Sequence, residues 1–211
     1  MSKKKICVIT GSRAEYGLFY PIITKINDSD RLELQLITTS SHHSSEYGKT
    51  FNEIENDGFC IDIKIDNLVS GNSKTAATKS LGLLITKLSD SLNQLNPDIV
   101  LLLGDRYETL GSAVAALIMN IPIAHIHGGE ITEGAVDEQI RHSISKMSYL
   151  HFCSTETYRK RLVQMGEDSK RVFVTGAPGI DNIFNLKLLS RVNLEKEIKW
   201  GLSSKFALFT Y

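Results

Sequence analysis

Short apolar runs alternate along the chain with longer stretches in which apolar residues recur every three or four positions. The short runs predict strands and the longer periodic stretches predict helices. Continuous apolar runs such as Ile99–Leu103 are typical of strands that are buried on both faces of a sheet. The predicted strands are residues 6–10, 32–39, 59–65, 98–103, 122–126, 150–153 and 172–174, and the predicted helices are residues 16–27, 47–56, 73–95, 108–119, 136–148 and 155–165.

This alternation of strands and helices predicts right-handed crossover units and a parallel sheet. We therefore expect an α/β fold with a doubly wound, Rossmann-like parallel sheet over residues 1–180. A helical linker is expected over residues 181–202. The apolar run 206–211 predicts a further strand, and we expect residues 203–211 to be the first strand of a truncated second domain. The alternative is that this strand extends the first sheet.

The composition is that of an ordinary globular protein, with 211 residues, 42% hydrophobic and 23% charged. Lys and Arg balance Asp and Glu at 24 each, so no net charge attracts nucleic acid or an anionic membrane, and neither is expected as a partner. Cys7, Cys60 and Cys153 are far apart and lie in or beside apolar runs, which favours buried free thiols. With no secretory or membrane-spanning pattern in the sequence, the expected location is cytoplasmic.

Polar residues follow the predicted strands at the edge where parallel α/β sheets bind ligands. The loop Gly11–Gly17 lacks the dinucleotide-binding glycine spacing, but its helix amino terminus and Arg13 are candidates for binding a phosphate. A salt bridge of Arg13 with Glu15 or with a neighbouring loop is the structural alternative. Asp105, which follows the most apolar strand, is a candidate for binding sugar hydroxyls or transferring protons, or for capping the next helix.

Two further segments concentrate acidic and histidine side chains. His125–Glu130 contains two glycines that allow a ligand to approach the backbone closely. Residues 137–142 hold two pairs spaced four apart, for which surface pairing is the alternative to binding. These histidine and acidic side chains also suggest a metal site, but their spacings match no compact ligand set, and none is expected. The candidate metal ligands were His125, His127, Glu130, Asp137, Glu138 and His142.

These segments resemble the hydrolysing UDP-N-acetylglucosamine 2-epimerases of sialic and legionaminic acid biosynthesis. The resemblance implies the N-terminal domain of a glycosyltransferase-B-type two-domain fold, with sugar nucleotide held between the domains. Family members are considerably longer, so the chain would correspond to an N-terminal half, and the full-length protein would be a homo-oligomer. The matching blocks, in family order and spacing, are Gly11–Gly17, Gly104–Glu108, His125–Glu130, Asp137–Met147 and residues 175–182.

The implied reaction converts UDP-N-acetylglucosamine into N-acetylmannosamine and UDP through a glycal, without a cofactor. Non-hydrolysing relatives, and some hydrolysing ones, carry a carboxylate where His127 stands, so either Glu130 supplies that carboxylate or His127 acts as the acid/base itself. The implied catalytic residues are Asp105, Glu130, Asp137 and His127, and the implied substrate-binding residues are Arg13, Glu15, Arg106, Glu138, Arg141 and His142.

Three alternatives stay open at this point. The same chemistry would act on a UDP-linked 2,4-diacetamido-trideoxy sugar or on a GDP-linked sugar. The 211-residue chain by itself would be a folded half that turns over no substrate, because half a cleft excludes water poorly. A flavodoxin-like or NAD-binding module is disfavoured by the missing glycine fingerprint.

Overall fold

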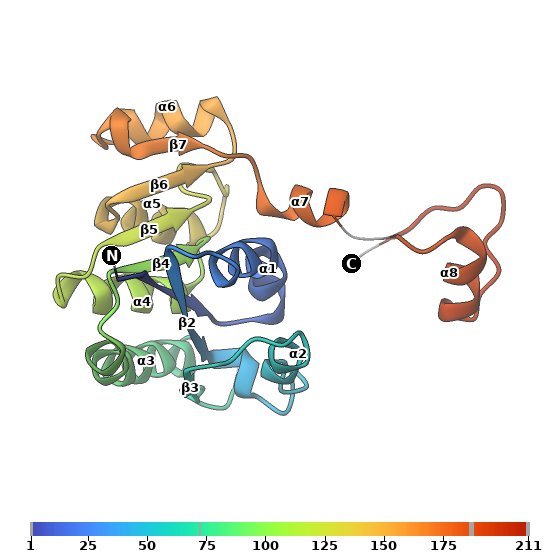
Figure 1. Cartoon of the computed structure of the whole chain (residues 1–211), viewed down its shortest axis with the longest axis horizontal. Coiled ribbons are helices and arrows are strands. Elements are labelled where there is room, and N and C mark those ends of the chain that lie inside the picture. The colour runs from blue at the N-terminus through green and yellow to red at the C-terminus, as the bar shows by residue number, and fades with distance from the viewer. Residues whose placement is uncertain (1, 72, 186–187, 210–211) are drawn as a thin grey trace.

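The computed structural model describes residues 2–71, 73–185 and 188–209. All pairings of the sheet are parallel, in the order β3-β2-β1-β4-β5-β6-β7 (Figure 1). The direction of winding reverses between β1 and β4, so the expected doubly wound, Rossmann-like parallel sheet is confirmed. The strands are β1 (Lys4–Thr10), β2 (Leu32–Thr39), β3 (Ile63–Ile65), β4 (Ile99–Leu103), β5 (Ile123–Ile126), β6 (Leu150–Cys153) and β7 (Val172–Val174).

Every helix predicted before residue 166 is present, with small shifts at the ends. The largest shift is at the second helix, which begins at Phe51 instead of residue 47. The first helix begins three residues earlier than predicted, at Arg13, because the Ser12 side chain accepts a hydrogen bond from the Glu15 amide and caps it. The helices are α1 (Arg13–Asn27), α2 (Phe51–Asn56), α3 (Lys74–Leu95), α4 (Tyr107–Ile118), α5 (Asp137–Met147), α6 (Glu156–Gln164), α7 (Pro178–Asn185) and α8 (Arg191–Ile198), with 3₁₀ turns η1 (Ser40–His43) and η2 (Ser169–Arg171).

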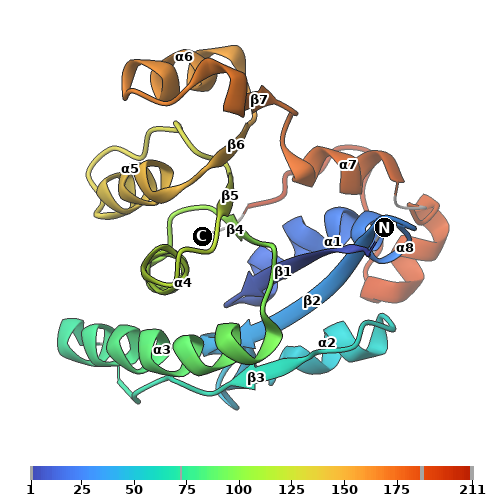
Figure 2. The ribbon, with the colours of Figure 1, turned by 60° about the vertical axis from the view of Figure 1, so that its left-hand side comes forward.

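Alternate residues of the central strands face two separate cores. Val100 and Leu102 of β4 pack with α3, α4 and α5 on one face of the sheet. Leu101 and Leu103 point to the other face and pack with α1. Figure 2 shows this arrangement, with α3, α4 and α5 on one side of the strands and α1 on the other. Burial of both faces explains why β4 is apolar at every position.

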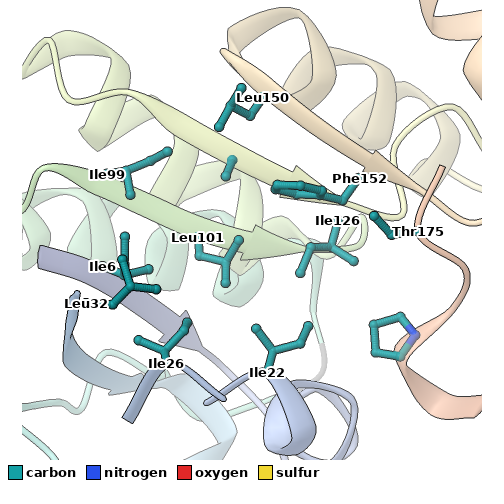
Figure 3. A pocket seen from close by; sticks show the side chains of 12 residues that line it. Ile6, Ile22, Ile26, Leu32, Ile99, Leu101, Ile126, Leu150, Phe152 and Thr175 are labelled. Atoms are coloured by element: carbon teal, nitrogen blue, oxygen red, sulfur yellow. The ribbon is translucent and has the colours of Figure 1, made fainter. Parts of the chain in front are cut away.

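The face that α1 partly covers has an apolar hollow of about 360 Å³ over β4, β5 and β6 (Figure 3). Side chains of Leu101, Ile126 and Phe152 point into it, and Ile22 of α1 borders it. Its lining is almost entirely hydrocarbon. The polar residues that follow the strands do not line this hollow for the most part, and lie at the carboxyl edge of the sheet.

The carboxyl-terminal segment differs from the sequence prediction. Helix α7 begins at Pro178 and packs against α1, where the Asn182 side-chain amide donates to the Gly17 carbonyl at 2.6 Å. Residues 206–209 are not in a strand and do not extend the described sheet, which ends at β3 and β7. The rest of that predicted strand, residues 210–211, lies outside the described residues, as do residues 186–187 of the predicted helical linker. The boundaries 1–180, 181–202 and 203–211 stay predictions.

Two further expectations concern thiols and membranes. All three cysteines are free, as expected, but Cys60 is exposed, and only Cys7 and Cys153 are buried. Within the described residues, no helix has both the length and the apolar character that crossing a bilayer requires.

Candidate active site

Arg141 lies at the centre of a cluster formed where β4 and β5 end. Its guanidinium donates to the Asp105 carboxylate, to the Thr132 hydroxyl at 3.1 Å and to the His127 carbonyl at 2.9 Å, and it lies 3.5 Å from a Glu130 oxygen. The arginine side chain is only 8% exposed, so its charge is desolvated and interacts strongly with these partners. Adjacent parallel strands thus bring three of the residues named from the sequence around one buried cation.

Glu130 is tied to both His127 and Ser154. His127 Nδ1 lies 2.6 Å from Glu130 Oε1, and the Ser154 hydroxyl donates to the same oxygen at 2.9 Å. Burial alone would raise the pKa of Glu130, but these hydrogen bonds and the Arg141 charge lower it below its ordinary value. An ionised carboxylate only accepts, so Nδ1 carries the ring hydrogen. The imidazole of His127 is therefore held with Nε2 as the nitrogen available to a substrate.

The backbone at His127 is strained. Its φ is +65°, in the left-handed region that a residue with a side chain seldom adopts. The Arg141 guanidinium bonds to the His127 carbonyl, and Glu130 bonds to its ring, so both backbone and side chain are fixed. Strain of this kind, about 1–3 kcal/mol, persists where the surrounding structure over-determines the conformation and is frequent at functional sites.

Asp105 and Asp137 lie close enough to influence each other. Burial raises the pKa of Asp105, Arg141 opposes that rise, and the charges of Asp137 and Glu130 add to it. Asp137 begins helix α5 and is half-buried. The sequence alternative of an Asp137–Arg141 surface pair is not what forms, because Arg141 turns inward to Asp105 and Glu130. Proton exchange between a substrate and one of these carboxyl groups is chemically accessible at this position.

The other residues named on α5 form a separate pair. Glu138 and His142 lie 3.6 Å apart, one helical turn from each other, as the spacing predicts. The Nδ1 atom of His142 is buried and has no hydrogen-bond partner among the described residues. A half-buried imidazole with one unsatisfied nitrogen fits the predicted contact with a ligand, which stays a prediction.

Arg13 and Glu15 lie apart from the Arg141 cluster, after β1. Arg13 is exposed and forms a salt bridge, but its partner is Glu53 of the neighbouring helix α2, at 2.9 Å, and not Glu15. Glu15 is buried under its own loop, where its carboxylate accepts the Gly11 amide hydrogen at 2.6 Å. Burial raises the pKa of Glu15 to about 7, with the Glu108 charge adding to the rise. The carboxyl group of Glu15 thus stabilises the loop between β1 and α1 through its hydrogen bond with the Gly11 amide.

A polar hollow of about 910 Å³ lies over the ends of β1, β2, β3 and β4. Arg13, Arg106 and Lys74 bring positive charge to its lining, and Arg106 is held at 3.1 Å by Glu108, whose side chain is only 4% exposed. Lys74 was missed from the sequence, as was Ser154 in the Arg141 cluster. The sequence signal for Ser154 is its position directly after β6, because polar residues that follow parallel strands gather at one edge of the sheet. We call this the strand-end rule.

No group of three or more His, Cys, Asp or Glu side chains in the described residues is arranged to hold a metal ion. The physical reason at the Asp105–Glu130 cluster is that the Arg141 guanidinium already lies between the carboxylates. A cation held by the chain itself balances their charge.

Fold and site together define an α/β protein that gathers acidic, histidine and cationic side chains along the carboxyl edge of its parallel sheet. The chain belongs to the UDP-N-acetylglucosamine 2-epimerase family, whose model matches residues 24–211. It is 45% identical over 211 residues to the GDP/UDP-N,N'-diacetylbacillosamine 2-epimerase (hydrolyzing) of Campylobacter jejuni, covering 100% of this chain and 55% of that protein. It is 38% identical over 208 residues to the UDP-N,N'-diacetylbacillosamine 2-epimerase (hydrolyzing) of Legionella pneumophila, covering 99% and 55%.

A UDP-N-acetylglucosamine 2-epimerase of Neisseria meningitidis is 37% identical over 178 residues, covering 84% of this chain and 46% of that protein. The chain therefore spans about half the length of the curated relatives it matches. The solved epimerase of N. meningitidis bound to UDP-GlcNAc superposes with a TM-score of 0.77 at 24% identity, over 92% of this chain and 51% of that one. The likeness is to one half of a longer chain, which confirms the expected fold class, the N-terminal domain of a glycosyltransferase-B-type fold.

Proposed function

We propose that this chain forms the amino-terminal side of the active site of a hydrolysing 2-epimerase. The substrate is a nucleotide-linked 2-acetamido sugar, and the products are the free 2-epimer and the nucleoside diphosphate. The observation that carries the proposal is the cluster of His127, Glu130 and Asp105 around buried Arg141, beside the half-buried Asp137. Membership of the epimerase family supports the reaction class.

The reaction needs proton transfer on both faces of the sugar. In the first step the C2 proton goes to a base, the C–H electron pair forms the C1=C2 bond, and the nucleoside diphosphate leaves with the C1–O bonding pair. In the second step the C1=C2 electron pair takes a proton from an acid on the opposite face of C2, and water bonds to C1 through its oxygen and loses one proton to a base. Inversion therefore requires two acid/base groups.

We assign one of these groups to His127. Glu130 uses one oxygen for His127 and Ser154, and the other approaches Arg141, so it acts best as the group that orients the imidazole. An imidazole exchanges protons readily near neutral pH. Asp105 and Asp137 supply the second group, because the raised pKa of Asp105 favours a carboxyl group that gives and takes a proton.

The departing diphosphate needs positive charge. Arg13 at the amino terminus of α1 and Arg106 line the polar hollow beside the Arg141 cluster, and the helix terminus adds its own dipole. A preorganised donor of this kind contributes about 3 kcal/mol to stabilising developing negative charge. Glu138 and His142 are proposed to contact the sugar. The burial of Glu15 favours support of the loop over direct contact with substrate.

Among the substrates, we favour UDP-N,N'-diacetylbacillosamine. The relatives at 45% and 38% identity carry that substrate in their names, whereas UDP-N-acetylglucosamine is named for a relative at 37%. The GDP-linked form is a third candidate, because the C. jejuni relative is named for both nucleotides. We further propose a cytoplasmic homo-oligomer, and we expect the 211-residue chain alone to show no turnover.

A direct assay separates these substrates. The longest protein that the gene encodes is incubated with each of the three sugar nucleotides, and released sugar and nucleotide are identified by NMR and mass spectrometry. Release of the 2-epimer of the diacetamido sugar at a kcat/KM at least tenfold above that for UDP-N-acetylglucosamine supports the assignment. Equal or better use of UDP-N-acetylglucosamine contradicts it while leaving the reaction class intact.

A further inference from the structure

His125 lies in the centre of β5 and has no exposed surface. Burial lowers the pKa of its imidazole to about 3, so the ring is neutral at physiological pH. Its Nε2 lies 2.8 Å from the Gly104 carbonyl oxygen, which only accepts, so Nε2 carries the hydrogen and donates it. The other nitrogen, Nδ1, lies 3.2 Å from the Ser145 hydroxyl, whose single hydrogen is shared between Nδ1 and the Arg141 carbonyl oxygen. This buried ring therefore has one defined tautomer with both nitrogens in use.

The two partners of the ring carry the ion pair of the candidate active site. Gly104 directly precedes Asp105, and its φ of +81° makes the sharp turn that takes the chain out of β4. Ser145 lies one helical turn after Arg141 on α5, and its hydroxyl reaches the Arg141 carbonyl oxygen at 3.0 Å. One side of the imidazole thus fixes the backbone of Asp105, and the other fixes the helix that carries Arg141.

Close packing leaves the ring no freedom to turn. Gly128 passes directly over it, and a Cβ at that position would lie 3.1 Å from His125 Nδ1 and 3.0 Å from the Ser145 hydroxyl oxygen. The same short segment leads on to Glu130. His125 therefore contacts all three pieces of chain that supply the cluster, although it has no contact with the solvent from which a substrate arrives.

We propose that His125 is a positioning residue for the Asp105–Arg141 pair. Its neutral imidazole acts as a spacer of fixed length between the β4–α4 turn and helix α5, and so sets where the carboxylate and the guanidinium meet. The kinetic consequence of this inference rests on the proposed 2-epimerase function. The predicted change in the position of the Asp105 carboxylate relative to the Arg141 guanidinium does not depend on that function.

The chain offers a matched control in His151. It is the register partner of His125 on β6 and its side chain is only 1% exposed, but it bonds to Glu167 at 3.0 Å instead of to either carrier of the ion pair. Replacing either histidine by Phe removes a buried imidazole from the same layer of the sheet. The two substitutions differ in whether the hydrogen bonds that are lost lead to Asp105 and Arg141.

The test compares four variants with the wild type. His125→Phe loses both hydrogen bonds of the ring, and His125→Gln keeps a side-chain N–H that can reach Gly104. Ser145→Ala keeps the bond to Gly104 but loses the hydroxyl that bonds to Nδ1 and to the Arg141 carbonyl oxygen. His151→Phe is the control. Turnover is measured on the longest protein that the gene encodes, per folded molecule, and the stability of each variant is measured by urea denaturation.

We expect His125→Phe to lower kcat by about 100-fold with KM changed less than threefold, since a misplacement of about 1 Å costs that much. His125→Gln should recover at least tenfold of this loss, and Ser145→Ala should show an intermediate loss. His151→Phe should keep kcat within twofold even where it destabilises the fold as much. Equal effects of His125→Phe and His151→Phe would overturn the inference, as would an unchanged kcat in His125→Phe. Should His125→Phe fail to fold, an unchanged kcat in Ser145→Ala together with no difference between His125→Gln and His151→Phe overturns it.

A structural measurement covers the case in which the wild type turns over none of the sugar nucleotides, which would refute the proposed function alone. Crystal structures of the 211-residue chain are compared for the wild type and the His125 variants. The inference expects the Asp105 carboxylate and the Arg141 guanidinium to separate when the Gly104 bond is lost, and to remain paired in His151→Phe. An unchanged pair in the His125 variants would overturn it.

Discussion

The carboxyl group of Glu15 lies beneath the loop between β1 and α1, with 7% of the residue exposed. Burial, with the Glu108 charge adding to its effect, raises the pKa of Glu15 from 4.5 to about 7 in the folded chain. In the unfolded chain the group is hydrated and titrates near its ordinary value. Between these two pKa values the folded state binds more protons than the unfolded state, so the contribution of Glu15 to stability falls as pH rises through that window.

The size of this effect follows from linkage. A difference of about 2.5 pKa units corresponds to about 3 kcal/mol, of which about 2 kcal/mol is lost between pH 5 and pH 8. Glu15→Gln removes the titration while keeping an oxygen that accepts the Gly11 amide hydrogen. We therefore expect the free energy of unfolding of Glu15→Gln, relative to the wild type, to rise by about 2 kcal/mol from pH 5 to pH 8.

Urea denaturation at pH 5, 6, 7 and 8 measures this difference directly. Comparing the variant with the wild type at each pH cancels the contributions of other groups, including buried His125, whose lowered pKa acts with the opposite sign. Glu156→Gln, which removes an exposed carboxylate on α6, is the control and should give a curve parallel to the wild type. The reasoning would be refuted if the free energy of unfolding of Glu15→Gln also ran parallel to that of the wild type, or if it rose relative to the wild type toward low pH.

The remaining predictions concern the loop after β5 and the cluster around it. Gly129→Ala should lower the free energy of unfolding by at least about 1 kcal/mol more than Gly134→Ala, because both have φ near +78° but only at Gly129 would a Cβ meet a backbone carbonyl of α6, at 2.6 Å. Equal losses by thermal melting would show that the close approach is not real. Arg141→Met should lower the free energy of unfolding by about 3 kcal/mol, because it leaves a buried carboxylate without its partner. In a double-mutant cycle with Asp105→Asn, the coupling free energy should be at least about 1 kcal/mol, and strictly additive effects would contradict the ion pair. His127→Gly should be about 1 kcal/mol more stable than His127→Ala because it relieves the positive φ, although both should abolish turnover; an activity in either above a tenth of the wild type would remove His127 from the chemistry.

Much of the fold can be predicted from the sequence because strands that are buried on both faces, such as β4, form continuous apolar runs. The third strand is an instructive exception, since it was expected from residue 59 and begins at Ile63. The Asp62 carboxylate accepts the Leu36 amide hydrogen at 2.7 Å, so a side chain takes the place of a ladder partner there. Local side-chain to backbone bonds of this kind cannot be inferred from a pattern of apolar residues.

The site was predicted in its parts but not in its arrangement. The strand-end rule placed Asp105 and Glu130 at one edge correctly, because adjacent parallel strands end side by side. It did not show that Arg141 would leave its i, i+4 neighbour Asp137 and turn inward to them. The burial of Glu15 could have been predicted from the sequence. Glu15 lies one helical turn before buried Phe19, and therefore on the core-facing side of α1.

The central claim is that the cluster around Arg141 removes and returns the proton at C2. The most direct test is to run the reaction of the longest protein that the gene encodes in D₂O with the diacetamido and N-acetylglucosamine nucleotides. The account predicts that the released sugar is the 2-epimer, that it carries one solvent deuteron at C2, and that free UDP appears with it in equal amount. Released sugar of unchanged C2 configuration that retains its original proton would show simple hydrolysis and contradict the account.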